Sequence, residues 1–283
     1  MTGKKVLYVS SEVIPYLPNN DISTLSYSLP KVVNKNGGQT RIFIPKYGII
    51  NERRHQLHEV IRLSGMNLII DDLDMPLIIK VASIPKERMQ VYFIDNEEYF
   101  KNRLLDSDKK KKLYDDNDER AIFFAKGVVE TIKKLNWSPD IIHVHGWIAS
   151  LMPLYLKEYY KDDPLFSKSK IVTSIYENEI SGNLNNEIVK KIKFDEVESD
   201  TLKVLDKTSY ENLYKISMLN SDGVVFANQN IKQTYIDLAN TLKIPILNCG
   251  FDEGFEKQYK DCLLYTSDAA DDTPCVDLGG RRI

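Results

Sequence analysis

Few cysteines, no long apolar run and no excess of either charge characterise this 283-residue sequence. Its three cysteines, Cys249, Cys262 and Cys275, are odd in number and lack metal-ligand spacing, which argues against a disulfide framework and a zinc site. No apolar segment reaches the roughly 18 to 20 residues that span a bilayer. The 38 basic residues nearly balance the 41 acidic ones. We therefore expect no membrane and no nucleic acid among the partners, but a neutral small molecule or an uncharged polymer.

Each end of the chain carries a signal of its own. The N-terminal letters MTGKKVLYVSS enter a strand pattern at once, without a signal-peptide pattern, which predicts a cytoplasmic protein. Residues 262–283 have turn-prone polar residues and no amphipathic period, unlike the chain before them. Two interpretations stay open, translated adapter read-through and a genuine disordered tail. We expect a folded domain over residues 1–261 and a tail over 262–283 that carries no chemistry.

Between these ends, short β-branched runs alternate with helical segments, the pattern of a parallel sheet with crossover helices. Residues 57–95 contain several strands in close succession, which predicts a hairpin excursion. The first helix is expected to begin at Ser23 or Thr24, both suitable caps, and to stop at Gly37 and Gly38. The sequence thus predicts an α/β fold with a three-layer, Rossmann-like parallel sheet. Strands are expected at residues 4–10, 40–45, 89–95, 140–144, 170–176, 222–228 and 244–248.

Several short segments stand out because of their letters, their order and their spacing. Some of them follow a predicted strand directly, where a parallel sheet places its ligands. One such match is weak, whereas several in a fixed order are specific. The segments are SSEVIPY at 10–16, LPK at 29–31, VYFIDNEEYF at 91–100, YDDNDERAIFF at 114–124, PDIIHVHGW at 139–147 and MPLYLK at 152–157.

These segments resemble SEVAPY, LPK, VYFIDNPEYF, YPDNAERFAFF, PDIVHxHDW and LPLYLK of bacterial glycogen synthases and plant starch synthases, over most of residues 4–175. The resemblance implies the N-terminal half of a two-domain GT-B glycosyltransferase. It also implies glucose transfer from ADP-glucose to the nonreducing end of an α-1,4-glucan, with retention of configuration and with no metal or other cofactor. Catalysis would rest largely on electrostatic stabilisation of the leaving diphosphate. No catalytic residue can be assigned within this half.

Polar and aromatic side chains near the strand ends are the candidate substrate-binding residues. The crevice of a parallel sheet lies at the carboxyl ends of its strands. Carboxylate, amide, guanidinium and imidazole groups can bind sugar hydroxyls, and Tyr or Trp rings can stack on sugar faces. The candidates are Glu12, Tyr16, Asp95, Asn96, Tyr99, Asn117, Arg120, His143, His145 and Trp147.

Five of these residues also have a purely structural interpretation. Asp95 and Asn96 suit a strand-ending turn. Arg120 suits an ion pair on a helix surface. His143 suits a hydrogen-bonded imidazole in the core, and Trp147 suits packing. The sequence leaves both interpretations open.

The turn after the first strand departs from the family pattern. The family has KTGGL there, whose glycines admit the nucleotide sugar and whose lysine faces its diphosphate. In this sequence Pro18 replaces the cation, and Asp21 places a carboxylate where a phosphate needs donors. Further on, Gly146 and Ile148 replace an aspartate and a histidine, and a second histidine is lost at Tyr176. These changes predict weak binding of the donor diphosphate.

Two functions follow as hypotheses. The first is a starch or glycogen synthase catalytic domain, incomplete on its own, because the donor-binding domain needs roughly 200 further residues. Its partners would be an α-glucan acceptor and ADP-glucose, the latter bound only weakly or through a partner domain. The alternative is a catalytically inactive glucan-binding or regulatory module. An unrelated nucleotide-binding protein is disfavoured, since neither GxGxxG nor GxxxxGK[ST] follows the first strand.

Overall fold

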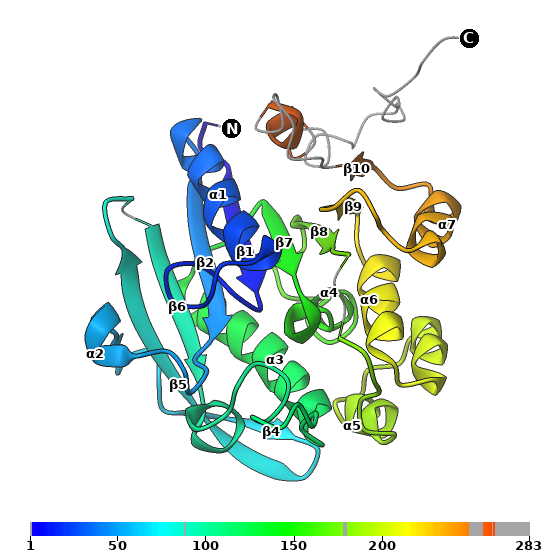
Figure 1. Ribbon diagram of the computed structural model, residues 1–283, viewed down its shortest axis with the longest axis horizontal. Helices are drawn as coiled ribbons and strands as arrows, with labels where there is room; N and C mark the ends of the chain where they lie inside the picture. Colours follow the sequence, from blue (N-terminus) through cyan, green and yellow to red (C-terminus); the bar gives the residue numbers. More distant parts are fainter. Residues whose placement is uncertain (1, 88, 178–179, 249–256, 262, 264–283) are drawn as a thin grey trace.

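The computed structural model describes residues 2–87, 89–177, 180–248, 257–261 and 263. Helices and strands alternate along this part of the chain (Figure 1). The strands are β1 (Lys5–Ser10), β2 (Gln39–Pro45), β3 (His58–Glu59), β4 (Met66–Ile70), β5 (Leu73–Ile84), β6 (Met89–Asp95), β7 (Ile141–His145), β8 (Lys170–Ile175), β9 (Gly223–Phe226) and β10 (Ile246–Asn248). The helices are α1 (Asp21–Lys35), α2 (Glu52–His55), η1 (Glu97–Lys101), α3 (Asn117–Leu135), η2 (Trp147–Ala149), α4 (Met152–Lys157), α5 (Ile188–Phe194), η3 (Asp200–Asp206), α6 (Tyr210–Leu219) and α7 (Gln233–Leu242).

The strands lie in the order β10-β9-β8-β7-β1-β2-β6-β5-β3, and β4 pairs with β5. Every pairing from β10 to β6 is parallel, whereas β5 runs antiparallel to β6, β4 and β3. The central strand β1 is apolar on both faces, as a strand covered on both sides requires. This confirms the α/β fold with a parallel sheet and a hairpin excursion that the sequence predicts.

Helices cover both faces of the sheet, which makes three layers (Figure 1). The hydroxyls of Ser10 on β1 and Ser26 on α1 lie 2.7 Å apart, so that this face of β1 is turned toward α1. On the opposite face, a Cβ at Gly127 of α3 would lie 3.1 Å from Ile94 of β6. The apolar residues of all the layers join in a single core.

The first helix begins earlier than the sequence predicts. Its N-cap is Asn20, whose side chain accepts a hydrogen bond from the backbone N–H of Ser23 while the Ser23 hydroxyl accepts one from the Asn20 N–H. The expectation of a cap at Ser23 or Thr24 is therefore wrong, because Ser23 is the third residue of a capping box. The helix ends at Lys35, just before Gly37, which has a φ of 82°.

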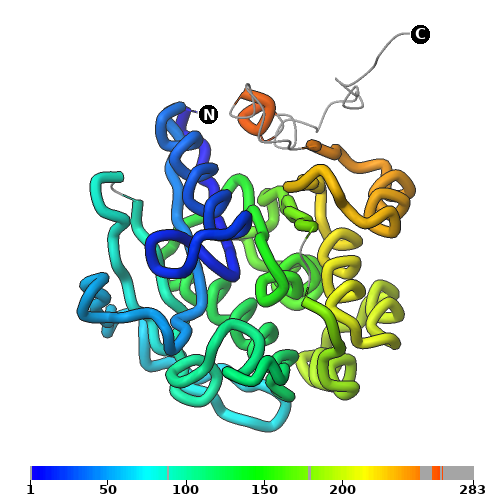
Figure 2. Tube along the Cα trace, in the orientation of Figure 1, coloured from blue at the N-terminus to red at the C-terminus, as the bar shows by residue number. Residues whose placement is uncertain are grey.

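The last described residues return to the first strand, as the trace in Figure 2 shows. Residues 257–261 and 263 are helical. The hydroxyl of Tyr259 lies 2.9 Å from that of Tyr8 on β1, and both Tyr259 and Leu263 are fully buried. The expected boundary after residue 261 stays a prediction, and the expected tail lies outside the described residues from residue 264 onward. No helix in the described part is long and apolar enough to cross a membrane.

Candidate functional site

The candidate site lies at the carboxyl ends of β1, β7, β8 and β9, the edge at which parallel sheets bind ligands. Ser10 of β1 is in register with His145 of β7, and His145 with Ser174 of β8. Three neighbouring strands therefore end side by side with polar residues. The turn from β1 into α1 closes this edge on one side.

Glu12 lies in that turn and is 6% exposed. Its Oε2 accepts a hydrogen bond from Asn20 Nδ2 at 2.7 Å. Burial raises the pKa of the Glu12 carboxyl to about 7, although the hydrogen bond from Asn20 opposes this shift. The protonated form of this carboxyl, which can donate as well as accept a hydrogen bond, is therefore much more accessible near neutral pH than it is in an exposed glutamate.

Groups of the chain itself occupy the N-terminus of α1. Asn20 accepts the hydrogen bond from the Ser23 N–H at 2.8 Å, and Asp21 adds a carboxylate in the first turn. Asp21 Oδ2 also accepts from Asn228 Nδ2 at 2.9 Å, a contact between residues 207 positions apart. Asn228 in turn accepts from the backbone N–H of Glu177 at 2.9 Å. A diphosphate at this helix end would meet a carboxylate and would compete for an N–H that is already bonded.

The two histidines of β7 lie on the same face, and their ring centroids are 4.0 Å apart. His143 is fully buried; its Nδ1 lies 2.7 Å from the Tyr259 hydroxyl and its Nε2 2.8 Å from Ser174 Oγ. Both ring nitrogens therefore have partners, as expected of a core imidazole. Burial, together with the neighbouring His145, holds the pKa of His143 well below its usual value.

His145 is also fully buried, but within the described part of the chain only one of its nitrogens forms a hydrogen bond. Nδ1 lies 2.7 Å from the hydroxyl of Tyr176, the residue that replaces a family histidine. Nε2 has no hydrogen-bond partner among the described residues. Burial lowers the pKa of His145 to about 3, so the imidazole is neutral throughout the physiological range.

Arg120 on α3 forms the centre of a second cluster. It is fully buried, and it donates from Nη1 to Asn117 Oδ1 at 2.7 Å and from Nη2 to the Leu104 carbonyl at 2.9 Å. The guanidinium lies 5.1 Å from the Tyr114 ring centroid and 5.8 Å from that of Trp147. Burial lowers the pKa of Arg120. The alternative of an ion pair on a helix surface is wrong for this residue, because aromatic rings and carbonyl oxygens surround it.

Trp147 and Asn117 belong to the same cluster through Tyr210. The Trp147 ring meets the Tyr210 ring edge-on, with centroids 5.6 Å apart, and Asn117 Nδ2 donates to the Tyr210 hydroxyl at 2.7 Å. Trp147 is 3% exposed, as its packing interpretation expects. The structure therefore brings Asn117, Arg120 and Trp147 together, although 30 positions separate the first from the last.

The neighbouring residues Asp95 and Asn96 have different partners. Asp95 Oδ2 pairs with Lys80 Nζ at 2.8 Å, while its Oδ1 is buried without a hydrogen-bond partner in the described part of the chain. Asn96 caps η1 by accepting from the N–H groups of Glu98 and Tyr99. Asn96 thus has the turn role that its structural interpretation expects, whereas Asp95 belongs to an ion pair.

The remaining two candidates are buried tyrosines. The Tyr99 hydroxyl donates a hydrogen bond to Glu119 Oε2 at 2.9 Å. Burial raises the pKa of Tyr99 most, and the negative charge of Glu119 raises it further. Tyr16 packs edge-on against Phe93, with ring centroids 5.0 Å apart, and its hydroxyl has no partner among the described residues. Burial raises the pKa of Tyr16 to about 12. Both rings are too enclosed to stack on a sugar without a rearrangement.

The residues at two changed family positions near Trp147 fit their present surroundings. Gly146 has a φ of 80°, and a Cβ there would lie 2.1 Å from Ser11 Oγ. An aspartate at this position would therefore strain the present turn. Ile148, which stands at the position of the second family histidine, is fully buried in the core.

Several residues that contact the candidate site residues are not predicted from the sequence. Tyr176 and Asn228 do carry a signal, since Tyr176 follows the buried strand β8 directly and Asn228 comes two residues after the end of β9. Tyr210 and Tyr259 carry none, because they lie far along the chain from Asn117 and His143. Among the described residues, no group of three or more His, Cys, Asp or Glu side chains is placed to hold a metal ion.

A parallel sheet covered by helices on both faces, with polar groups at its carboxyl edge, is a Rossmann-like fold, and in this chain it is similar to half of a GT-B glycosyltransferase. The catalytic domain of starch synthase IV from Arabidopsis thaliana, solved with ADP and acarbose, has this fold, with a TM-score of 0.66 and 18% identity. The similarity covers 87% of this chain and 52% of that one. Within that fold, the chain belongs to the starch synthase catalytic domain family, which matches residues 5–238.

Bacterial relatives agree with this assignment. The glycogen synthase of Chlorobium luteolum is 40% identical over 198 residues, which cover 68% of this chain and 40% of that protein. The glycogen synthase of Chlorobium limicola is 36% identical over 228 residues, which cover 80% of this chain and 47% of that protein. The chain thus spans less than half the length of these relatives. The family resemblance and the fold class expected from the sequence are confirmed.

Proposed function

We propose that this chain is the acceptor-side half of an α-1,4-glucan synthase. It binds the nonreducing end of an α-glucan at the carboxyl edge of its sheet, and it takes part in glucose transfer from ADP-glucose when a donor-binding domain faces that edge. The observation that carries this proposal is the family match over residues 5–238, in a chain that spans less than half of its glycogen synthase relatives. The cytoplasmic location expected from the sequence stays a prediction.

The groups at the crevice edge suit an uncharged polymer of hydroxyls. Glu12, Asp21, Glu177 and Asn228 supply carboxylate and amide oxygens, which accept hydrogen bonds from sugar hydroxyls. The imidazole of His145 is neutral and buried, and one of its nitrogens has no partner among the described residues. A neutral ligand suffers no electrostatic repulsion from these carboxylates and a smaller desolvation cost than a charged one, whereas a phosphate is repelled by their negative charge.

The donor binds this half only weakly in our proposal. The α1 terminus is capped by Asn20, carries the Asp21 carboxylate and has Pro18 in place of a cation. Asn20 occupies a backbone donor, Asp21 adds a negative charge, and Pro18 supplies neither a positive charge nor an N–H, so that a diphosphate finds fewer favourable contacts here. Most of the binding energy for ADP-glucose would therefore come from a partner domain.

The test is transfer of labelled glucose from ADP-glucose to glycogen. The purified chain should transfer none by itself, and it should transfer glucose when the separately produced C-terminal half of the Chlorobium limicola glycogen synthase is added. The C-terminal half alone is the matched control. Transfer by the chain alone would contradict the need for a donor domain. Absence of transfer in the mixture, while glycogen still binds the chain, would favour a glucan-binding module instead.

A further inference from the structure

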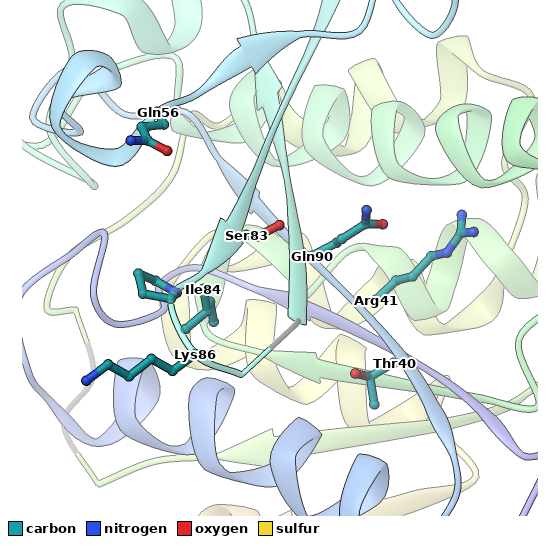
Figure 3. Close-up of a pocket in the computed structure, with 8 residues that line it drawn as sticks. Thr40, Arg41, Gln56, Ser83, Ile84, Lys86 and Gln90 are labelled. Carbon is teal, nitrogen blue, oxygen red and sulfur yellow. The ribbon is translucent and has the colours of Figure 1, made fainter.

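The amino ends of β2 and β6, at the opposite end of the sheet from the candidate site, border a hollow. It has a volume of about 600 Å³. Arg41 of β2, Gln90 of β6 and Ser83 of β5 are among its lining residues (Figure 3). None of the lining residues is acidic, whereas two, Arg41 and Lys86, are cationic.

The register of the strands places three donors in a row. Ser83 pairs with Gln90 across β5 and β6, and Arg41 precedes Ile42, the partner of Val91, so Arg41 stands beside Gln90. Side chains in register on neighbouring strands share a face and lie about 5 Å apart. In Figure 3, Arg41 and Gln90 extend toward the same side, while Lys86 points away from them. Guanidinium, amide and hydroxyl groups thus line one side of the sheet end.

Arg41 carries a positive charge that has no ion-pair partner among the described residues. Its Nη1 is buried and makes no hydrogen bond within the described part of the chain. The guanidinium lies 4.8 Å from the Trp137 ring centroid and 5.7 Å from that of Tyr92, so two rings fix its position. Burial lowers the pKa of Arg41, and the nearby charge of Arg62 acts in the same direction. Within the part of the chain that the structure describes, this guanidinium is therefore available to bind an anion.

The side-chain amide of Gln90, next to Arg41, is oriented so that it can donate to the same anion. Tyr92 donates its hydroxyl hydrogen to Gln90 Oε1 at 3.2 Å, and the Gln90 Nε2 group donates to no acceptor among the described residues, so that it can donate toward the hollow. Ser83 and Gln90 are both exposed, so a ligand reaches them from solvent. The guanidinium fork suits phosphate oxygens, and its hydrogen bonds to an anion are charge-assisted.

We infer that the hollow beside Arg41, Gln90 and Ser83 is a binding site for the phosphoryl group of a small phosphorylated molecule, at the opposite end of the sheet from the glucan crevice. Its volume exceeds that of a phosphate ion and leaves room for an attached polyol. The site is independent of the proposed transfer reaction, because none of its residues belongs to the crevice.

The experiment titrates the full chain with inorganic phosphate and with glycerol 3-phosphate at constant ionic strength, using calorimetry and tryptophan fluorescence. Trp137 and Trp147 are the only tryptophans of the sequence, and Trp137 stacks on Arg41. We expect saturable binding of both anions with a change in fluorescence, and none with glycerol. Trp137→Phe should remove most of the fluorescence change.

Arg41→Gln should weaken binding at least about tenfold, because the charge-assisted contact is lost. Arg41→Lys should bind with intermediate affinity, since it keeps the charge but not the fork. Lys110→Gln, in an exposed loop, is the control and should bind as the unaltered chain does. Lack of saturable binding to the unaltered chain would overturn the inference. Equal affinity of the folded Arg41→Gln or Arg41→Lys variants and the unaltered chain would overturn it too.

Discussion

Glu12 shows at the scale of one residue how burial sets a charge. Its pKa in the folded chain is raised to about 7, against about 4.3 for an unfolded glutamate. The folded state therefore holds a proton that the unfolded state releases between these values. The stability contributed by this proton is fully present below the unfolded pKa and is lost as the pH rises through 7.

Glu12→Gln should remove this loss. Glutamine keeps an oxygen that accepts from Asn20 and never ionises, so we expect the variant to gain about 1–3 kcal/mol of stability over the unaltered chain at pH 8. The gain should shrink toward pH 5. Urea unfolding at several pH values measures it, with Glu98→Gln at an exposed position as the control. If the free energy of unfolding had the same pH dependence in Glu12→Gln and Glu98→Gln, the raised pKa of Glu12 would be contradicted.

Asp21 is the residue that should repel a diphosphate most directly. Asp21→Asn keeps an oxygen for the contact with Asn228 and removes one negative charge at the start of α1. We expect ADP to bind about three- to tenfold more tightly, since one such charge costs roughly 1 kcal/mol. Calorimetric titration with ADP at low salt tests this. Asp200→Asn, in the first turn of η3, should change nothing; an unchanged affinity in Asp21→Asn would contradict the proposal.

At the scale of an element, β7 carries an acid-sensitive pair. His143 and His145 stay neutral in the folded chain, while an unfolded histidine takes up a proton near pH 6.5. Their contribution to stability is therefore present above pH 6.5 and is lost as the pH falls below it. Between pH 7 and pH 5 we expect a loss of about 2 kcal/mol for each imidazole, partly offset by Glu12.

His145→Gln should remove the share of one imidazole from this acid dependence, about 2 kcal/mol between pH 7 and pH 5, whatever it does to stability at neutral pH. The readout is the slope of the free energy of unfolding between pH 7 and pH 5. His58→Gln, on the exposed edge strand β3, is the matched control and should keep the full slope. An unaltered slope in His145→Gln would show that the imidazole is not held neutral.

The helical residues 257–261 are docked on the sheet by Tyr259, which contacts Tyr8 on β1 and His143 on β7. Tyr259→Phe removes the contacts with Tyr8 and His143 and leaves a buried imidazole nitrogen without a partner, so we expect a loss of about 1–3 kcal/mol. Urea unfolding measures the loss. Tyr159→Phe, at a tyrosine that is 45% exposed, should cost much less. Equal stability of the two variants would contradict the docking of this segment.

At the scale of the whole molecule, the sequence predicts the architecture better than the contacts. The strands of the parallel sheet are visible as short β-branched runs, because burial on both faces leaves a continuous apolar pattern. The hairpin excursion is visible as closely spaced strand-like runs, although β4 and β5 alternate between buried and more exposed residues. The start of α1 was misplaced, because Ser23 is a good cap in isolation and only the reciprocal bond with Asn20 shows its true position.

The partners of the candidate residues could not be predicted, because they come from distant parts of the chain. Asp21 meets Asn228 across 207 positions, and Tyr8 meets Tyr259 across 251. Such contacts depend on the order of the strands, which no periodicity in the sequence specifies. The family resemblance indicated where the crevice lies. It did not indicate that the crevice candidates divide into an arginine cluster and a histidine pair.

Calorimetric titration of the full chain with maltoheptaose tests the acceptor-side proposal most directly, with the β-linked cellohexaose as control. We predict saturable heat with maltoheptaose and none with cellohexaose, because the edge of the sheet is proposed to bind an α-1,4-glucan. The absence of saturable heat with maltoheptaose, or equal binding of both oligosaccharides, would contradict the account.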